Sequence, residues 1–194
     1  MENCVIEVHP IIEYPPCLKS GKKQDCFSCD IAFKKKCNSP RGMCTLAYPA
    51  HKKGCPNYNK RKDCPPNVKM VDEYFDMSKP IYFIIYEFPL PQHIEKMRIK
   101  HPNWTERQLR NCLYWQRSAR KRLKENVKCF LKKHSDQEYV VNYTPEAMGV
   151  NVSKTIAQYG IRLDWPPFHS VCKIALAGVL KENTLYDKEI FEKS

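Results

Sequence analysis

The sequence is poor in glycine and has no long apolar run. Six of its 194 residues are glycine, and none lies in a glycine-rich phosphate-binding loop, so a bound nucleotide finds no support. No apolar stretch approaches the roughly 18 residues that a membrane-spanning helix needs. The first segment, MENCVIEVHPIIEYPP, has neither the basic nor the apolar region of a secretory signal. We therefore expect a cytoplasmic protein without a membrane partner.

The sequence also lacks a hydrolytic constellation. Its histidines are dispersed, and none is paired with a nucleophile at a known spacing. His169 lies near Cys172 and is either a late metal ligand or a surface-turn residue, and we favour the second reading. The six histidines are His9, His51, His93, His101, His134 and His169.

The composition is that of an ordered globular chain. Apolar residues make up 42% and aromatic residues 11%, which is enough for a hydrophobic core. Fifteen prolines favour stiff connections over flexible linkers. At this length we expect a single domain, residues 1–194, with a cysteine-rich metal-binding segment at 17–66 and an α+β core at 67–180.

Cysteine is abundant and unevenly distributed. Seven of the eleven cysteines lie between Cys17 and Cys64, in a stretch with almost no apolar periodicity. Such a stretch has no core of its own, so its thiols must be cross-linked or bound to metal. A reducing compartment and an odd cysteine count favour metal. The predicted ligands are Cys26, Cys29, Cys37, Cys44, Cys55 and Cys64.

The cysteine spacing favours an iron–sulfur cluster, most simply 4Fe-4S, over zinc. Cys26 and Cys29 form the only CxxC pair, whereas two structural zinc sites would typically show a second one. Cys55 and Cys64 are each followed by proline, like the last ligand of the bacterial ferredoxin run. The many lysines of the segment would offset the negative charge of a thiolate-bound cluster. Zinc is the alternative cofactor, and a redox pair of Cys26 and Cys29 in a thiol oxidoreductase is a further alternative.

Positive charge is concentrated in two blocks. Residues 19–62 contain twelve Lys or Arg and two acidic residues, and residues 94–133 contain thirteen and three. Because the rest of the chain is acidic, this segregation favours an anionic partner, either RNA or DNA or an acidic redox protein. An equally weighted alternative is that both blocks are simply solvated surfaces.

The second block predicts one long helix over residues 105–133. This stretch contains no proline or glycine. A capping box of Thr105 with Gln108, or of Asn103 with Glu106, would start it.

The predicted helix has an apolar and a basic face. We expect Cys112 and Cys129 to lie on or beside the apolar face as core thiols. The basic face is typical of any surface helix, but it also fits a zinc-stabilised nucleic-acid-binding module in which an aromatic ring lies among cations. Its nucleic-acid-binding residues would be Arg110, Tyr114, Arg117, Lys121, Lys124 and Lys128.

The remaining pattern alternates strands and short helices. We expect a helix shortly after Cys64, which would place that thiol near a helix N-terminus. Together the elements predict an α+β fold, with a single mixed sheet packed by the long helix. They are a strand within 4–14 that is interrupted or ended at Pro10, a helix after Pro66, a central strand at 81–88, helical turns at 92–100, a strand at 139–143, a helix capped by Asn151 or Ser153, and strands at 161–165 and 170–180.

Three stretches resemble a known family. They read GCPNYNKRKDCPPNVK, NWTERQLRNCLYWQRSARKRL and PEAMGVNVSKTIAQYG, and the first is the most specific. They are similar to a cysteine-rich prokaryotic family of predicted metal-binding proteins of unknown function. The resemblance runs from about Cys44 to Leu180 and carries no reaction with it.

The resemblance implies that Cys44, Cys55 and Cys64 bind a metal or cluster, and that the turn at 148–151 belongs to the functional surface. One departure stands out. Relatives of this type carry more cysteines just before the PEAMG-like segment. This chain has QEYVVNYT at that place, and the nearest cysteine upstream is Cys129. Its additional cysteines are N-terminal instead: Cys17, Cys26, Cys29 and Cys37. A second site is therefore either lost here or built from different residues.

Overall fold

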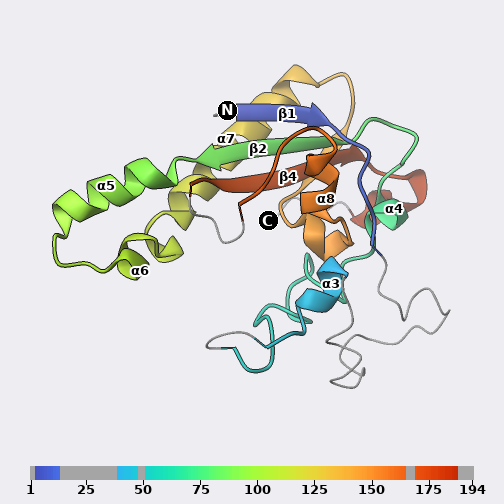
Figure 1. Ribbon diagram of the computed structural model, residues 1–194. Helices are drawn as coiled ribbons and strands as arrows, with labels where there is room; N and C mark the ends of the chain where they lie inside the picture. Colours follow the sequence, from blue (N-terminus) through green and yellow to red (C-terminus); the bar gives the residue numbers. More distant parts are fainter. Residues whose placement is uncertain (1–2, 14–38, 48–50, 165–168, 188–194) are drawn as a thin grey trace.

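A four-stranded sheet forms the centre of the protein. The computed structural model describes residues 3–13, 39–47, 51–164 and 169–187. The strands lie in the order β1-β2-β4-β3 (Figure 1). The α+β class is confirmed, but each described pairing is antiparallel where we expected a mixed sheet. The strands are β1 (Asn3–Glu7), β2 (Tyr82–Phe88), β3 (Tyr139–Asn142) and β4 (Val171–Val179).

The two central strands are covered on both faces, as their continuous apolar sequences predict. On β2, Phe83 packs in one core cluster and its neighbour Ile84 in another, because successive strand residues point to opposite faces. On β4, Leu176 and Ala177 divide in the same way. This two-sided burial is why neither strand shows polar alternation.

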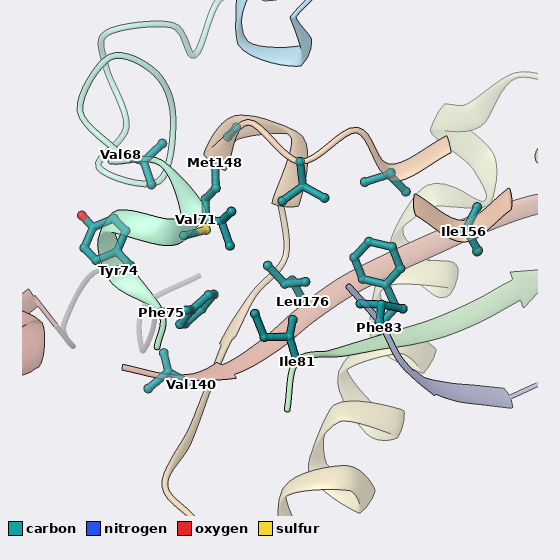
Figure 2. Close-up of a cluster of buried hydrophobic side chains, with 14 of the residues drawn as sticks. Val68, Val71, Tyr74, Phe75, Ile81, Phe83, Val140, Met148, Ile156 and Leu176 are labelled. Carbon is teal, nitrogen blue, oxygen red and sulfur yellow. The ribbon is translucent and has the colours of Figure 1, made fainter. Parts of the chain in front are cut away.

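The larger core lies on the face that also carries the candidate site. It packs α4 (Val71–Tyr74), the 3-10 turn η2 (Pro145–Met148) and α8 (Val152–Ala157) against the sheet (Figure 2). Asn151 caps α8, since its side chain accepts a hydrogen bond from the Lys154 amide at 3.0 Å. The fully buried members include Val68, Val71, Phe75, Phe83, Met148, Val150, Ile156 and Leu176.

The opposite face of the sheet is covered by α7 (Gln116–Lys133). Its buried side chains Leu123, Val127 and Phe130 pack on Ile84 and on small residues of β4. Ala175 and Ala177 let the helix approach the strand closely. The prediction that an amphipathic helix packs on the sheet is therefore confirmed.

The predicted single helix over 105–133 is wrong. Its first part is α6 (Glu106–Leu109), which begins with the expected capping box of Thr105 and Gln108, followed by the 3-10 turn η1 (Cys112–Tyr114). The Asn111 side chain accepts a hydrogen bond from the Leu113 amide at 3.0 Å and replaces a helical turn by a tighter one. The Trp115 ring stacks on Phe88 at 5.0 Å between centroids, and this packing holds the break in place.

The break changes which side chains face the core. Leu113 is 77% exposed, and Cys112 is exposed as well, although both belong to the predicted apolar face. Cys129 lies within α7 but is also exposed. The prediction that Cys112 and Cys129 are core thiols is therefore wrong.

Two further predictions fail for local reasons. The helix expected shortly after Cys64 is only α4, which begins seven residues later at Val71, so Cys64 is not at a helix N-terminus. Residues 161–164 form no strand. By contrast, α5 (Leu90–Lys100) is longer than the expected one or two turns. The last described element is the 3-10 helix η3 (Glu182–Asp187).

Among the helices that the structure describes, none is both long and apolar enough to cross a bilayer.

The central packing predicts a large effect for Phe83→Ala. Phe83 is 0% exposed, and truncating a buried Phe typically costs about 3–5 kcal/mol of unfolding free energy because a cavity remains. The matched control is Ile99→Ala, since Ile99 is 83% exposed and its loss should change stability by less than about 0.5 kcal/mol. Urea denaturation followed by far-UV circular dichroism measures both. Equal midpoints for the two variants would contradict this description of the core.

Candidate metal centre

The first described cysteine of the candidate site follows a short helix. In α3 (Pro40–Met43), the Ser39 side chain accepts a hydrogen bond from the Gly42 amide at 3.1 Å and caps the N-terminus. Cys44 is the residue that ends the helix, and its amide donates to the Arg41 carbonyl at 3.2 Å. The cap and the proline at the start of α3 thus fix where Cys44 leaves the helix.

A glycine brings the second cysteine against the first. The Cys55 amide donates a hydrogen bond to the Cys44 carbonyl oxygen at 2.8 Å. Gly54, just before it, has φ +85°, a conformation that other residues rarely adopt. A Cβ atom at Gly54 would lie 2.6 Å from the Cys44 carbonyl oxygen, which is closer than real contacts allow. The close approach of Cys44 and Cys55 therefore requires glycine at position 54.

The third cysteine lies in a turn that is held by charge and by hydrogen bonds. The guanidinium of Arg61 forms two bonds with the Asp63 carboxylate, at 2.8 and 2.7 Å. The Cys64 amide donates to the Arg61 carbonyl at 3.3 Å, and the Val68 amide donates to the Cys64 carbonyl at 3.1 Å. The turn thus runs directly into Val68, which is anchored in the larger core (Figure 2).

Two side chains connect these turns with each other and with the sheet. The Arg41 guanidinium, which belongs to a residue only 8% exposed, donates to the Pro66 carbonyl at 3.4 Å and so joins α3 to the Cys64 turn. The Thr144 hydroxyl donates to the Asp63 carbonyl at 3.3 Å. Since α3 also packs against η2, the cysteine turns are docked on one face of the fold (Figure 1).

The three thiols share one electrostatic environment. Burial raises the pKa of the Cys44 thiol, negative charge on Cys55 raises it further, and the Arg41 guanidinium lowers it. Burial also raises the pKa of Cys64 to about 11, and the Asp63 carboxylate adds to the rise while Arg61 opposes it. Near pH 7 these two thiols are therefore protonated, and a metal ion that binds them must displace their protons.

An acidic residue, Glu146, lies near the thiols, and the sequence pattern did not reveal it. Desolvation by neighbouring groups raises the pKa of Glu146, an exposed residue of η2, and Lys173 opposes the rise. Charge on Glu146 in turn raises the pKa of Cys44. Burial lowers the pKa of Lys173 on β4, and Arg120 lowers it further. Glu146 and Arg41 have no motif of their own, so only the fold identifies them as neighbours of the site.

The turn at 148–151 is part of the core rather than of an open surface. Met148 and Val150 are 0% exposed. Gly149 has φ +83°, and its carbonyl accepts a hydrogen bond from the Glu13 amide at 2.9 Å. The Asn151 amide donates to the Ile11 carbonyl at 2.8 Å. The turn therefore fixes the segment after β1, and Glu146 is the residue beside it that reaches the thiol environment.

The predicted ligands divide into two groups. Cys44, Cys55 and Cys64 are brought together, and all three are half-buried and free of disulfides. The other three predicted ligands, Cys26, Cys29 and Cys37, lie outside the described residues. Within the described part of the chain, no three Cys, His, Asp or Glu side chains already stand at coordinating positions.

The three thiols fit a thiolate-bound metal in chemistry. Their sulfurs come from separate turns that are tied together by backbone bonds, and cations lie beside two of them. Thiolates are the common ligands of iron–sulfur clusters and of structural zinc. Coordination would require the three side chains to close on a common centre.

The remaining candidates lie away from these turns. The His169 imidazole pairs with Asp164 at 3.0 Å, and its side chain is 87% exposed. Arg110 pairs with Glu106 at 3.6 Å, and Tyr114 belongs to η1 rather than to the long helix. The other predicted nucleic-acid residues, which are exposed on α7, are Arg117, Lys121, Lys124 and Lys128.

A comparison with protein families finds one match. The family model described as "Predicted metal-binding protein (DUF2284)" matches residues 46–180. The match includes Cys55 and Cys64 and begins two residues after Cys44. No curated protein and no solved structure matches the chain.

The packing around Gly54 predicts a local loss of structure in Gly54→Ala. The alanine would combine an unfavourable positive φ, worth about 1–2 kcal/mol, with a backbone clash at Cys44. We expect the Cys55 amide to lose its protection from hydrogen exchange. Gly160→Ala is the matched control, because Gly160 has φ +77° but no atom lies within 4 Å of the place that an alanine Cβ would take. Unchanged protection of Cys55 in Gly54→Ala would show that the two cysteines do not need the glycine.

Proposed function

The chain belongs to the DUF2284 family of predicted metal-binding proteins, whose family model spans more than half of its residues, and we propose that it holds an iron–sulfur cluster, most simply 4Fe-4S. Cys44, Cys55 and Cys64 supply three of the thiolates. The protein then serves a redox role or a cluster-dependent enzymatic one. The main support for the proposal is the hydrogen bond from the Cys55 amide to the Cys44 carbonyl. It brings together two cysteines that are eleven residues apart in the sequence.

The charge around these cysteines supports a cluster. A cubane with four thiolate ligands carries net negative charge, which nearby cations offset. Arg41 is buried beside Cys44, and Arg61 lies beside Cys64. Burying a charged guanidinium costs free energy unless it has an anionic or hydrogen-bonding partner. A negatively charged cluster would therefore stabilise Arg41 in addition to its hydrogen bond with Pro66.

The spacing and sequence context support a cluster over zinc. Structural zinc sites draw their ligands from closely spaced pairs, whereas Cys44, Cys55 and Cys64 are separated by ten and eight residues. The prolines after Cys55 and Cys64 match the cysteine–proline step of ferredoxin-type ligand runs. A fourth thiolate would come from Cys26, Cys29 or Cys37, whose positions lie outside the described residues.

The surrounding residues have separable tasks in this proposal. When bound, the cluster supplies one-electron chemistry. Gly54 allows two ligand turns to approach, and Arg61 with Asp63 holds the third. Burial of the thiols limits the access of water and oxidants. Glu146 contributes negative charge that acts on the Cys44 thiol.

The first test is the colour and metal content of the protein. Anaerobically prepared full-length protein should be brown, with a broad visible absorption that bleaches on reduction with dithionite, and should contain iron and acid-labile sulfide. Iron, sulfide and zinc are measured on the same sample. A colourless protein with stoichiometric zinc would overturn the iron–sulfur assignment and support the zinc alternative.

The second test assigns the ligands. Cys44→Ser, Cys55→Ser and Cys64→Ser should each lower the iron content and visible absorption severely. Cys112→Ser and Cys129→Ser are matched controls, because both thiols are exposed and lie outside the cysteine turns. Full absorption in a Cys55→Ser variant that remains folded would remove this site from the proposal.

The same preparation addresses the thiol oxidoreductase alternative. If Cys26 and Cys29 act as a redox pair, alkylation should modify both in the reduced, metal-loaded protein and neither after oxidation. If they ligate metal, they should resist alkylation until the metal is removed by a chelator. Mass spectrometry of the alkylated peptides distinguishes the two results.

A further inference from the structure

A helical arm extends beyond the end of the sheet. It consists of α5, α6 and η1, which project from the strands (Figure 1). A small core of its own fixes the arm, with Trp115 stacked on Phe88 as its centre. The other buried members are Leu90, Ile94, Leu109 and Ala119. The arm is therefore held in place by packed side chains of its own.

The arm carries a row of stacked aromatic rings. His101 stacks on Trp104 with 4.0 Å between centroids and 6° between planes. Trp104 packs on Tyr114 at 4.7 Å and 33°. Tyr114, at the end of the row, is 51% exposed. One face of its ring is therefore supported by Trp104, while much of the side chain remains open to solvent.

Two apolar side chains close in sequence to these rings are also exposed. Ile99 is 83% exposed and Leu113 is 77% exposed. These are the highest exposures among the large apolar side chains that the structure describes. Exposed apolar groups next to an aromatic row are typical of a contact surface. Leu113 follows the break at Asn111 and belongs to the 3-10 turn η1 rather than to the apolar face of a continuous helix.

The charge around the arm is strongly positive. Residues 90–124, which cover the arm and the first half of α7, contain ten Lys or Arg and two acidic residues, Glu95 and Glu106. Glu106 is already engaged by Arg98 and Arg110. Arg107 on α6 is exposed, as are Arg117 and the basic residues of α7 that follow it. Exposed cations therefore lie close in sequence to the aromatic row, on both sides of Tyr114.

We propose that the arm and the adjoining face of α7 bind single-stranded nucleic acid. A base stacks on the open side of Tyr114, and Arg107 and Arg117 contact phosphates. Planar rings with a cationic border suit a base and its phosphates, since every base offers a flat face for stacking. An acidic protein would be recognised by charge alone and would not require a stacked ring. Binding at the arm is independent of the metal that the cysteines hold.

The position of the stacking ring differs from that in a continuous basic helix. In a helix over 105–133, Tyr114 would lie on the same broad basic face as Lys121 and Lys124. The structure instead sets Tyr114 against Trp104 and leaves Lys124 over the ring of Tyr143, at 5.5 Å. The stacking position is thus on the arm, and α7 supplies charge.

The test measures binding of the full-length protein to a fluorescent oligouridylate of about 12 nucleotides, by anisotropy. Tyr114→Ala should weaken binding about tenfold, because one base-stacking contact is lost. Tyr114→Phe keeps the ring and should retain wild-type affinity, which separates loss of stacking from disturbance of the arm. Tyr159→Ala is the matched control, since Tyr159 is an exposed tyrosine elsewhere, at 37%.

The charge contribution is tested separately. Arg107→Ala combined with Arg117→Ala should reduce the slope of log affinity against log salt by about two. Lys79→Ala, a change at an exposed lysine outside the arm, should leave the slope almost unchanged. Three results would each overturn the proposal: no binding at low salt, wild-type affinity in Tyr114→Ala, or equal competition by polyglutamate.

Discussion

The antiparallel pairing of β2 with β4 is the constraint on which the other parts depend. Seven residue pairs, from Tyr82 with Ala177 to Phe88 with Val171, fix the register of two strands that are buried on both faces. A one-residue slip would exchange the two faces and place the residues of each core on the wrong side. With that register set, α7 can cover only one face, and α4, η2 and α8 cover the other. The thiol turns and the arm are both attached to this frame.

The candidate centre shows how a segment without its own core obtains a defined position. Its turns contribute few apolar side chains, so they are held by backbone hydrogen bonds, by the ion pair of Arg61 with Asp63, and by attachment to η2. Such bonds contribute about 0.5–1.5 kcal/mol each, which fixes geometry more than it stabilises the fold. A segment of this kind gains most from a bound metal, because the ligand bonds replace the missing core.

The sequence predicted the features that depend on local chemistry or on strong apolar patterns. The strands 81–88 and 170–180, the Thr105 capping box and the Asn151 cap all follow from residues within a few positions of one another. The break at Asn111 was missed because it depends on Trp115 packing against Phe88, which is distant in the sequence. Arg41 and Glu146 were missed for the same reason, since their roles arise only when α3 docks on η2. The convergence of Cys44 and Cys55 was partly accessible, because a glycine directly before a cysteine is consistent with a tight approach.

The two basic blocks have the same net charge in the sequence, and in both most of the described Lys and Arg residues are exposed. Around the thiols, Arg41 is buried and Arg61 is paired, so positive charge there is part of the site. Along the arm and α7 the cations are mostly exposed. Charges from both regions act on Lys173 of β4. Arg120 on α7 lowers the pKa of Lys173, and Glu146 raises it. Glu146 also raises the pKa of Cys44, so the same carboxylate acts on Lys173 and on the first thiol of the candidate site.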